Sequence, residues 1–276
     1  MAIAFIGGGN MATALIGGML ARGGAVDEFR VVEPLAEARA RIAARFPGLA
    51  VFGESTRAAV AGAALIVLAV KPQQMRPAAS ALAPHIAGAA APVVLSIAAG
   101  IRLADLARWL HGHARLVRAM PNTPALVGKG ISGVFAAAAV DAAGRALVSS
   151  VLAAAGEQVW VESEAMLDAV TGVSGSGPAY VFYFLEALEA AARDLGFAPA
   201  DARKLAYATF SGAIALAEAS PVEPAVLRAQ VTSKGGTTER ALASLEADAV
   251  KAKIVAAVKA AALRAGELGD AFGRDA

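Results

Sequence analysis

Two short stretches combine glycines with hydroxyl side chains in a way that suits a small anionic substrate. Residues 171–180 read TGVSGSGPAY, and residues 232–240 read TSKGGTTER. Glycine lets the backbone approach a ligand closely, and exposed N–H groups and hydroxyls can bind a carboxylate. The alternatives are a flexible turn between helices for the first stretch and an ordinary capped helix start for the second.

A third stretch has the spacing of a phosphate-binding turn. The pattern G-x-G-x-x-A follows the apolar run 2–6 and precedes a helical pattern. Gly7 permits a tight turn, Gly9 lets a pyrophosphate reach the backbone, and Ala12 allows close packing of helix on strand. The helix start adds N–H donors and the positive end of its dipole. This strand–turn–helix context predicts a dinucleotide site. Its residues are Gly7, Gly8, Gly9, Asn10, Met11 and Ala12.

A carboxylate follows the next predicted strand, residues 29–32. Glu33 lies 21 residues past Ala12, where it can bind the adenosine ribose hydroxyls of NAD and repel the extra phosphate of NADP. Arg39 and Arg41 fall on a helical pattern, which favours solvation over phosphate binding. We therefore expect NADH or NADPH as cofactor, with a preference for NADH. If Glu33 instead points into solvent, the preference is undetermined.

Further strand ends predict other cofactor contacts, because ligands of open α/β sheets bind beyond the carboxyl ends of the strands. The run 65–70 is apolar throughout, as a central parallel strand should be. Lys71 after it either contacts phosphate or ribose, or only begins a helix. Asn122, held between two prolines, either meets the nicotinamide amide or serves only a turn. The residues placed at these ends are Ala69, Val70, Lys71, Pro72, Ala98 and Asn122.

The chain changes character near Val161. Strands and helices alternate before it, so residues 1–161 are expected to form a Rossmann-type dinucleotide-binding domain of the α/β class. Residues 162–276 are expected to form an all-α dimerisation domain. Their alanine-rich apolar faces are broader than about 115 residues can cover, which predicts a helical dimer interface. The segments with helical periodicity are 164–171, 179–195, 199–219, 223–231 and 238–267.

Composition excludes several other classes of protein. The chain has 276 residues, a formal charge of +2 from scattered basic residues, and no cysteine. This argues against nucleic-acid binding, disulfides, thiolate metal sites and a cysteine nucleophile. The three histidines do not cluster with carboxylates, so we expect no metal. The start lacks a signal-peptide n-region, and prolines interrupt the uncharged stretch 77–101, so we expect a cytoplasmic protein without a membrane span.

The sequence closely resembles the pyrroline-5-carboxylate reductase family, which performs the last step of proline synthesis. The resemblance runs nearly end to end, and its two longest motifs are not shared by dinucleotide-binding folds in general. It implies an N-terminal domain that binds NAD(P)H and a helical domain that forms an interlocked dimer, often assembled into decamers. The matching motifs are FIGGGNMA, AVKP at 69–72, SIAAG at 96–100, RAMPNTPA at 118–125, DAVTGVSGSGPAYVF at 168–182 and TSKGGTTERAL at 232–242.

The resemblance also implies roles for single residues. Gly236, Thr237 and Thr238 would hold the carboxylate of 1-pyrroline-5-carboxylate, and Thr171 would lie beside its ring nitrogen. Hydride would pass from the nicotinamide to the imine carbon, and Thr171 would either relay a proton or only hydrogen-bond a substrate already protonated from water. The lesser candidates for substrate contact are Ser174, Ser176 and Glu164.

The sequence departs from the family pattern at three places. Many members have proline where Lys234 stands, and commonly asparagine where Thr56 stands. Many NADP-using members carry Asn-Arg where this chain has Glu33-Pro34, which supports the expected preference for NADH.

Two other functions stay open at this point. A related β-hydroxyacid or prephenate-type dehydrogenase would usually need a lysine or histidine in a glycine–lysine context of the helical domain, and the lysines there lack it. A non-catalytic sensor of dinucleotide or proline would bind the cofactor tightly without oxidising it.

Overall fold

The computed structural model describes residues 2–88 and 91–274. The chain forms two compact units, and each is described by itself. The sheet unit consists of Met1–Ser176 together with Ala260–Ala276, and the helical unit is Gly177–Lys259. The last helix, α12 (Val250–Arg274), therefore contributes residues to both units.

An eight-stranded sheet organises the described part of the sheet unit. Its strand order is β3-β2-β1-β4-β5-β6-β7-β8. The first six strands along the chain run parallel, β7 runs antiparallel to β6, and β8 runs parallel to β7. The strands are β1 (Ala2–Ile6), β2 (Phe29–Val32), β3 (Ala50–Phe52), β4 (Ala63–Leu68), β5 (Val93–Ser96), β6 (Leu116–Met120), β7 (Gly130–Ala136) and β8 (Gly156–Trp160).

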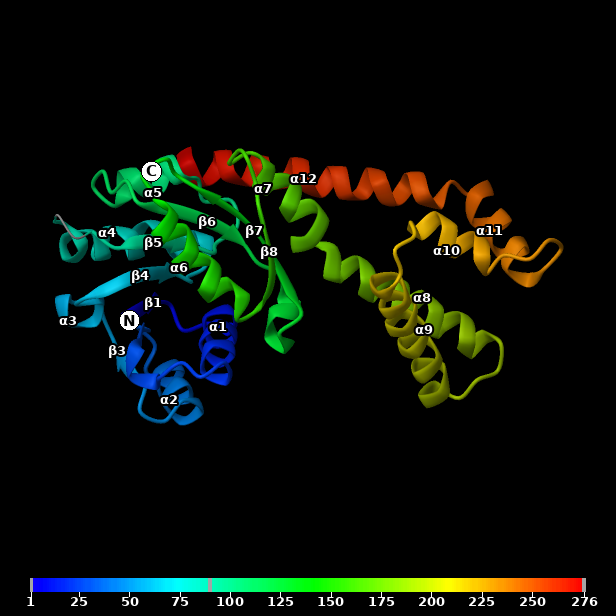
Figure 1. Cartoon of the computed structure of the whole chain (residues 1–276), viewed down its shortest axis with the longest axis horizontal. Helices are drawn as coiled ribbons and strands as arrows, with labels where there is room; N and C mark the ends of the chain where they lie inside the picture. The colour runs from blue at the N-terminus through cyan, green and yellow to red at the C-terminus, as the bar shows by residue number, and fades with distance from the viewer. Residues whose placement is uncertain (1, 89–90, 275–276) are drawn as a thin grey trace. The chain divides into compact units, whose positions relative to one another are not determined.

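Helices cover both faces of this sheet (Figure 1). One buried cluster joins the sheet to α1, α2 and α6, and another joins it to α3, α4, α5 and the end of α12. The helices are α1 (Asn10–Ala21), α2 (Ala36–Arg45), α3 (Arg57–Val60), α4 (Met75–Ile86), α5 (Leu103–Trp109), α6 (Ala142–Ala153) and α7 (Met166–Val170). Shorter turns are η1 (Val26–Glu28), η2 (Pro72–Gln74), η3 (Thr123–Val127) and the π-helical η4 (Thr171–Gly175).

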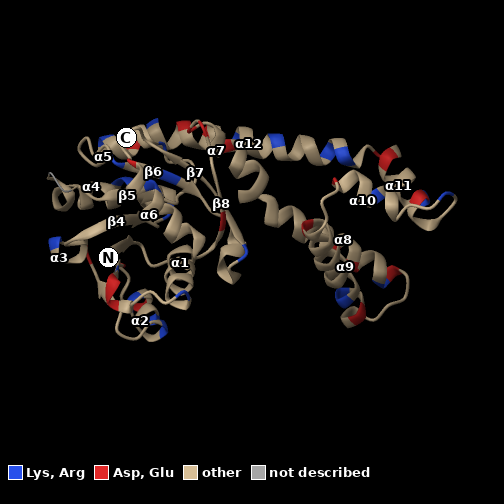
Figure 2. Cartoon of the chain, in the orientation of Figure 1, with Lys and Arg blue, Asp and Glu red and all other residues tan. Residues whose placement is uncertain are grey.

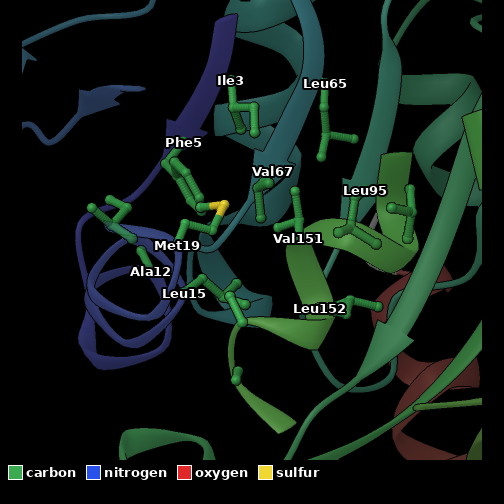
Figure 3. Close-up of a cluster of buried hydrophobic side chains, with 14 of the residues drawn as sticks. Ile3, Phe5, Ala12, Leu15, Met19, Leu65, Val67, Leu95, Val151 and Leu152 are labelled. Atoms are coloured by element: carbon green, nitrogen blue, oxygen red, sulfur yellow. The ribbon is translucent and has the colours of Figure 1, made fainter. Parts of the chain in front are cut away.

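Strand β4 shows why the sheet needs two helical layers. Leu65 and Val67 belong to the first buried cluster, whereas Ile66 and Leu68 belong to the second. Successive side chains of a strand point to opposite faces, and each fully buried aliphatic side chain contributes about 1.5–3 kcal/mol. Figure 3 shows Val67 beside Phe5 and Leu95 of the neighbouring strands. The predicted central strand, buried on both faces, is confirmed.

The end of α12 is anchored on the sheet unit. Phe272 packs against the second buried cluster, close to Gly100. Arg102 donates hydrogen bonds to Asp270 Oδ1 at 2.6 Å and to the Gly266 carbonyl at 3.3 Å. An apolar contact and charge-assisted hydrogen bonds therefore tie the last turns of the chain to residues near β5.

The helical unit is poor in buried side chains. Its helices α8 and α9 pack against each other, yet the buried residues of α8–α11 are only Ala202 and Ala206. Phe182 and Tyr183 are 57% and 71% exposed, and much of α8 and α9 is uncharged in Figure 2. Such apolar exposure is unusual for a surface facing water. The helices are α8 (Gly177–Asp194), α9 (Pro199–Ala219), α10 (Pro224–Gln230), α11 (Thr237–Ala247) and the start of α12.

The segment 238–267, which carries helical periodicity, contains two helices. Helix α11 ends at Ala247 and α12 begins at Val250. Ala249 between them has a φ of 51°, a left-handed conformation that usually falls to glycine or asparagine. No glycine or proline marks this break, so the sequence pattern gives no sign of it.

Two kinds of feature are absent from the described ranges. Over residues 2–88 and 91–274, no helix combines the length and the apolar character needed to cross a bilayer. The same residues contain no group of three or more His, Asp or Glu side chains that could hold a metal ion.

Two adjacent glycines in α1 give a test of close packing in the sheet unit. A Cβ added at Gly18 would collide with the Ala154 carbonyl, whereas one at Gly17 would lie 3.8 Å from Phe46, an ordinary contact. Both substitutions gain helix propensity of about 0.8–1 kcal/mol. We expect Gly17→Ala to raise the free energy of unfolding in urea and Gly18→Ala to lower it, because overpacking costs about 1–3 kcal/mol. Equal stability of the two variants would contradict this packing.

Candidate active site

The glycine turn after β1 is built by close contacts. Gly7 has a φ of 99°, and a Cβ there would lie 2.9 Å from the backbone carbonyl of Ala69, so only glycine fits. A Cβ at Gly8 would collide with Ile42 of α2. Gly9 differs, because a Cβ added there would meet nothing within 4 Å. Gly7 and Gly8 therefore serve packing, while Gly9 borders open space at the start of α1.

A cleft lies beside this turn. After β1 the chain continues on one side of the sheet, and after β4 it continues on the other side. The cavity volume of the cleft is about 690 Å³, and such a switch point is where open α/β sheets bind ligands. Of the predicted cofactor residues, Gly7, Gly9, Glu33, Ala69, Val70 and Lys71 line it. Those not among its lining residues are Gly8, Asn10, Met11, Ala12, Pro72, Ala98 and Asn122.

Some walls of the cleft were missed from the sequence. Gly53, Glu54 and Ser55 follow β3, and Gln74 and Pro77 come from η2 and α4. The first three were recoverable, because β3 is parallel to β2 and its carboxyl end lies at the same edge of the sheet. The wall from α4 depends on how that helix packs, which no local pattern indicates.

Glu33 is turned toward the glycine turn. Its Oε2 accepts the Gly8 N–H and its Oε1 accepts the Leu35 N–H, both at 3.0 Å. The alternative in which Glu33 points into solvent is therefore not observed. Arg39 donates to the Glu33 and Pro34 carbonyls at 2.9 and 2.7 Å, so its guanidinium is engaged by backbone oxygens.

These residues fit a dinucleotide. The first-turn N–H groups of α1 would bind a phosphate at this helix end, and the space beside Gly9, where an added Cβ would meet nothing within 4 Å, leaves room for it. A carboxylate that lines the cleft at the end of β2 suits ribose hydroxyls. A cleft of about 690 Å³ lined by both apolar and charged residues suits part of a dinucleotide better than a compact anion.

Asn122 lies at the carboxyl end of β6, on the same edge of the sheet as the glycine turn. Its side chain is buried, with Nδ2 donating to the Ser174 carbonyl at 3.1 Å and Oδ1 accepting the Ile131 N–H at 3.0 Å. Both ends of the amide are thus committed to protein groups. These contacts favour the alternative in which Asn122 serves a turn; its contact with nicotinamide stays a prediction.

The hydroxyls of η4 donate hydrogen bonds to backbone carbonyls earlier in the chain. Thr171 Oγ1 donates to the Leu167 carbonyl at 2.7 Å, and Ser174 Oγ donates to the Val170 carbonyl at 3.1 Å. The Ser176 N–H reaches the Thr171 carbonyl at 2.8 Å, five residues back, which closes a π-helical ring. Such single π turns are rare and frequently occur at functional sites. Thr171, Ser174 and Ser176 therefore come together on one turn.

Glu164 has a different setting. Its Oε1 lies 2.6 Å from Arg118 Nη1 and accepts the Leu103 N–H at 2.7 Å. A carboxylate with a buried guanidinium and a backbone N–H as partners is held by the fold. Its predicted contact with substrate is not tested by these bonds.

In the helical unit, Gly236 caps α11 in an extended conformation, with no side chain accepting a hydrogen bond at that cap. Gly235 has a φ of 71°, and its N–H donates to Glu239 Oε2 at 2.6 Å. Thr237 and Thr238 form the first turn of the helix. A helix start without a capping side chain presents N–H groups that suit a carboxylate.

Comparisons with known proteins cover nearly the whole chain. Residues 164–268 match the family model of pyrroline-5-carboxylate reductase dimerisation, and residues 2–100 match that of NADP oxidoreductase, coenzyme F420-dependent. A pyrroline-5-carboxylate reductase of Pseudomonas aeruginosa is 45% identical over 272 residues, covering 99% of this chain and 98% of that protein. One from Pisum sativum is 35% identical, covering 96% and 95%.

Solved structures agree with these relatives. A pyrroline-5-carboxylate reductase from Coxiella burnetii has a TM-score of 0.90 at 36% identity, covering 96% of this chain and 97% of that one. Pyrroline carboxylate reductase from Plasmodium falciparum, with NADP bound, has a TM-score of 0.85 at 25% identity and covers 98% of each chain. A prephenate dehydrogenase from A. aeolicus shares only the fold, at 17% identity and a TM-score of 0.51. The chain belongs to the pyrroline-5-carboxylate reductase family.

Proposed function

We propose that this protein reduces the imine of 1-pyrroline-5-carboxylate to L-proline with NAD(P)H. The observation that carries the proposal is 45% identity to a pyrroline-5-carboxylate reductase over 99% of the chain. The dinucleotide cleft beside Gly9 and Glu33 supports it from the structure. Neither a prephenate-type dehydrogenase, similar only in fold, nor a non-catalytic sensor is favoured by these relatives.

The sheet unit would hold the cofactor. The reduced nicotinamide, when bound, supplies a hydride to the imine carbon, while the imine nitrogen gains a proton. The first turn of α1 would bind the pyrophosphate through its N–H groups, and Glu33 would accept hydrogen bonds from the ribose hydroxyls. Ala69, Val70 and Lys71 would border the nicotinamide half, since they continue from the buried end of β4.

The helical unit would bind the substrate carboxylate. The N-terminus of α11, with Gly236, Thr237 and Thr238, offers N–H groups, two hydroxyls and the positive end of a helix dipole. Because Gly235 already donates its N–H to Glu239, the N–H groups of the following residues are the better candidates.

Thr171 would lie at the ring nitrogen as a hydrogen-bond acceptor. Its proton is engaged by the Leu167 carbonyl at 2.7 Å, so the oxygen lone pairs face a ligand more readily than the proton does. A hydroxyl is also a poor acid near neutral pH. We therefore favour a substrate that is protonated by water before hydride transfer, with Thr171 accepting the iminium N–H.

Substitution of Thr171 tests this role. Thr171→Val keeps the shape and removes the hydroxyl, so we expect kcat to fall about 10- to 100-fold, the value of one hydrogen bond to a charged group. Thr171→Ser should retain most of the activity. Steady-state kinetics against pH separate the two roles. A loss that is equal at all pH values fits an acceptor, whereas a loss that grows with pH would indicate a proton donor.

For the cofactor, we propose a preference for NADH over NADPH. The carboxylates of Glu33 and Glu54 both line the cleft, where they would repel a 2′-phosphate. Arg39, a cation near this end of β2, donates hydrogen bonds to the Glu33 and Pro34 carbonyls.

An assay with both cofactors tests activity and preference together. The wild-type protein should oxidise NADH when pyrroline-5-carboxylate is added, with a higher kcat/KM than for NADPH. Glu33→Gln keeps an oxygen that can accept the Gly8 N–H but removes the charge. We expect it to shift the ratio toward NADPH by about tenfold, which corresponds to about 1.4 kcal/mol.

Two outcomes of that assay would count against the proposals. A strong wild-type preference for NADPH would refute the role of Glu33 without touching the reaction. Tight NADH binding with no oxidation would refute the reaction itself and favour a sensor.

We also propose that the helical unit forms a homodimer, with assembly into decamers and a cytoplasmic location as further predictions. Support comes from the match of residues 164–268 to a dimerisation model. The exposed apolar side chains of α8 and α9 would become the core that this unit lacks by itself.

A charge on that surface tests the dimer. Phe182→Glu places a carboxylate on an exposed apolar face of α8, so we expect light scattering to give the mass of a monomer, where wild type gives a multiple of it. Ala40→Glu, on the exposed side of α2, is the matched control and should leave the mass unchanged. A wild-type monomer would contradict the proposal.

A further inference from the structure

Three side chains of the RAMPN stretch reach one segment of the chain. Arg118, Met120 and Asn122 are spaced by two residues along β6 and the extended backbone after it. Alternate residues of an extended chain share a side. All three contact residues 164–175, here called the wall segment, which contains α7 and η4. All of these residues belong to the sheet unit.

Arg118 holds the beginning of the wall segment. Its side chain is 7% exposed and its Nη1 lies 2.6 Å from Glu164 Oε1. The same carboxylate oxygen accepts the Leu103 N–H at the start of α5. A buried charge with one close partner strongly resists losing it, so this pair fixes where the wall segment leaves β8.

The wall segment packs against Met120 and its cross-strand partner. Met120 pairs with Gly133 of β7. A Cβ at Gly133 would lie 2.6–3.0 Å from the branched side chain of Val170, and a Cβ at Gly175 would lie 2.7 Å from Met120 Cε. Because Gly133 and Gly175 have no side chains, α7 and η4 can pack closely against β6 and β7.

Asn122 holds the other end of the wall segment. It is 8% exposed, and it joins the Ser174 carbonyl to the Ile131 N–H through its two amide atoms. The Ser174 carbonyl belongs to a π-helical turn, whose wider ring lacks the regular bonding of an α-helix. Asn122 thus supplies from outside a hydrogen bond that fixes the shape of η4.

We propose that Arg118, Met120 and Asn122 form a positioning stripe that sets the place of the Thr171 hydroxyl for the reaction. This inference rests on the proposed function, in which Thr171 accepts the ring N–H of the substrate. None of the three need touch substrate or cofactor. Their action passes through the wall segment, since Thr171 lies in η4 between the anchors at Glu164 and Ser174.

Asn122→Asp tests the stripe with little change in shape. The new carboxylate can still accept the Ile131 N–H but cannot donate to the Ser174 carbonyl. We expect kcat to fall about 10- to 100-fold, since a shift of about 1 Å costs about 100-fold. The Kd for NADH, measured by fluorescence titration, should stay within about twofold of wild type, because the cofactor cleft is built from other residues.

Gln158→Glu is the matched control. Gln158 Nε2 also donates to a backbone carbonyl, that of Ser149, at 3.3 Å, and this bond joins β8 to α6 rather than to the wall segment. Gln158 Oε1 is buried and accepts no hydrogen bond from the described residues, so the same amide-to-carboxylate change there should lower stability while leaving the kcat of the folded protein near wild type. Amide hydrogen exchange of the peptide covering η4 should accelerate in Asn122→Asp and not in Gln158→Glu.

If Asn122→Asp does not fold, Gly175→Ala serves instead. Its methyl group would push against Met120 and should lower kcat. Met120→Val removes the colliding methyl group, so the double variant should recover activity. Failure of this rescue would overturn the proposed contact.

Several results would overturn the stripe. They are an unchanged kcat in Asn122→Asp, an equal loss in Gln158→Glu, or a proportional loss of NADH affinity, which would make Asn122 a cofactor ligand. If the wild-type protein does not reduce pyrroline-5-carboxylate, the proposed function fails. Hydrogen exchange then decides the stripe alone, and unchanged exchange in Asn122→Asp overturns it.

Discussion

The close approach of the β1 turn to the end of β4 is the constraint on which the site depends. Gly7 lies against the Ala69 carbonyl with no room for a side chain. This contact brings two parallel strands to a common edge just where the chain turns to opposite sides of the sheet. The cleft, the start of α1 and the carboxylate after β2 all take their places from that edge. A larger residue at position 7 would push the β1 turn away from the end of β4. It would thereby displace the cleft, the start of α1 and the carboxylate after β2 at the same time.

Much of the sheet unit could be predicted from sequence, because its signals are local. The apolar run at β4 is explained by the burial of that strand. The glycine turn at Gly7–Gly9 is explained by its backbone geometry. The placement of Glu33 follows from its spacing of 21 residues past Ala12 and from the end of the predicted strand 29–32. The carboxylate was predicted to face the cofactor, and it does line the cleft.

Other features could not be predicted, because their causes are distant in sequence. For Asn122 the sequence allows a nicotinamide contact or a turn, and the Ser174 carbonyl, which favours the turn, lies 52 residues away along the chain. Gly133 has no local signal for its contact with Val170. The break at Ala249 has no local signal, because an alanine adopts there a conformation that sequence patterns assign to glycine.

The anchoring of α12 has a consequence for how the protein is made. The sheet unit is discontinuous in sequence, since its last part, residues 260–276, follows the entire helical unit. Phe272 and Asp270 contact groups near β5 that are synthesised much earlier. The second buried cluster therefore lacks its contact with Phe272 until translation is nearly finished. The helical unit emerges in full before the sheet unit can be completed, so a chain truncated after residue 259 would keep the residues of the helical unit and lack the last part of the sheet unit.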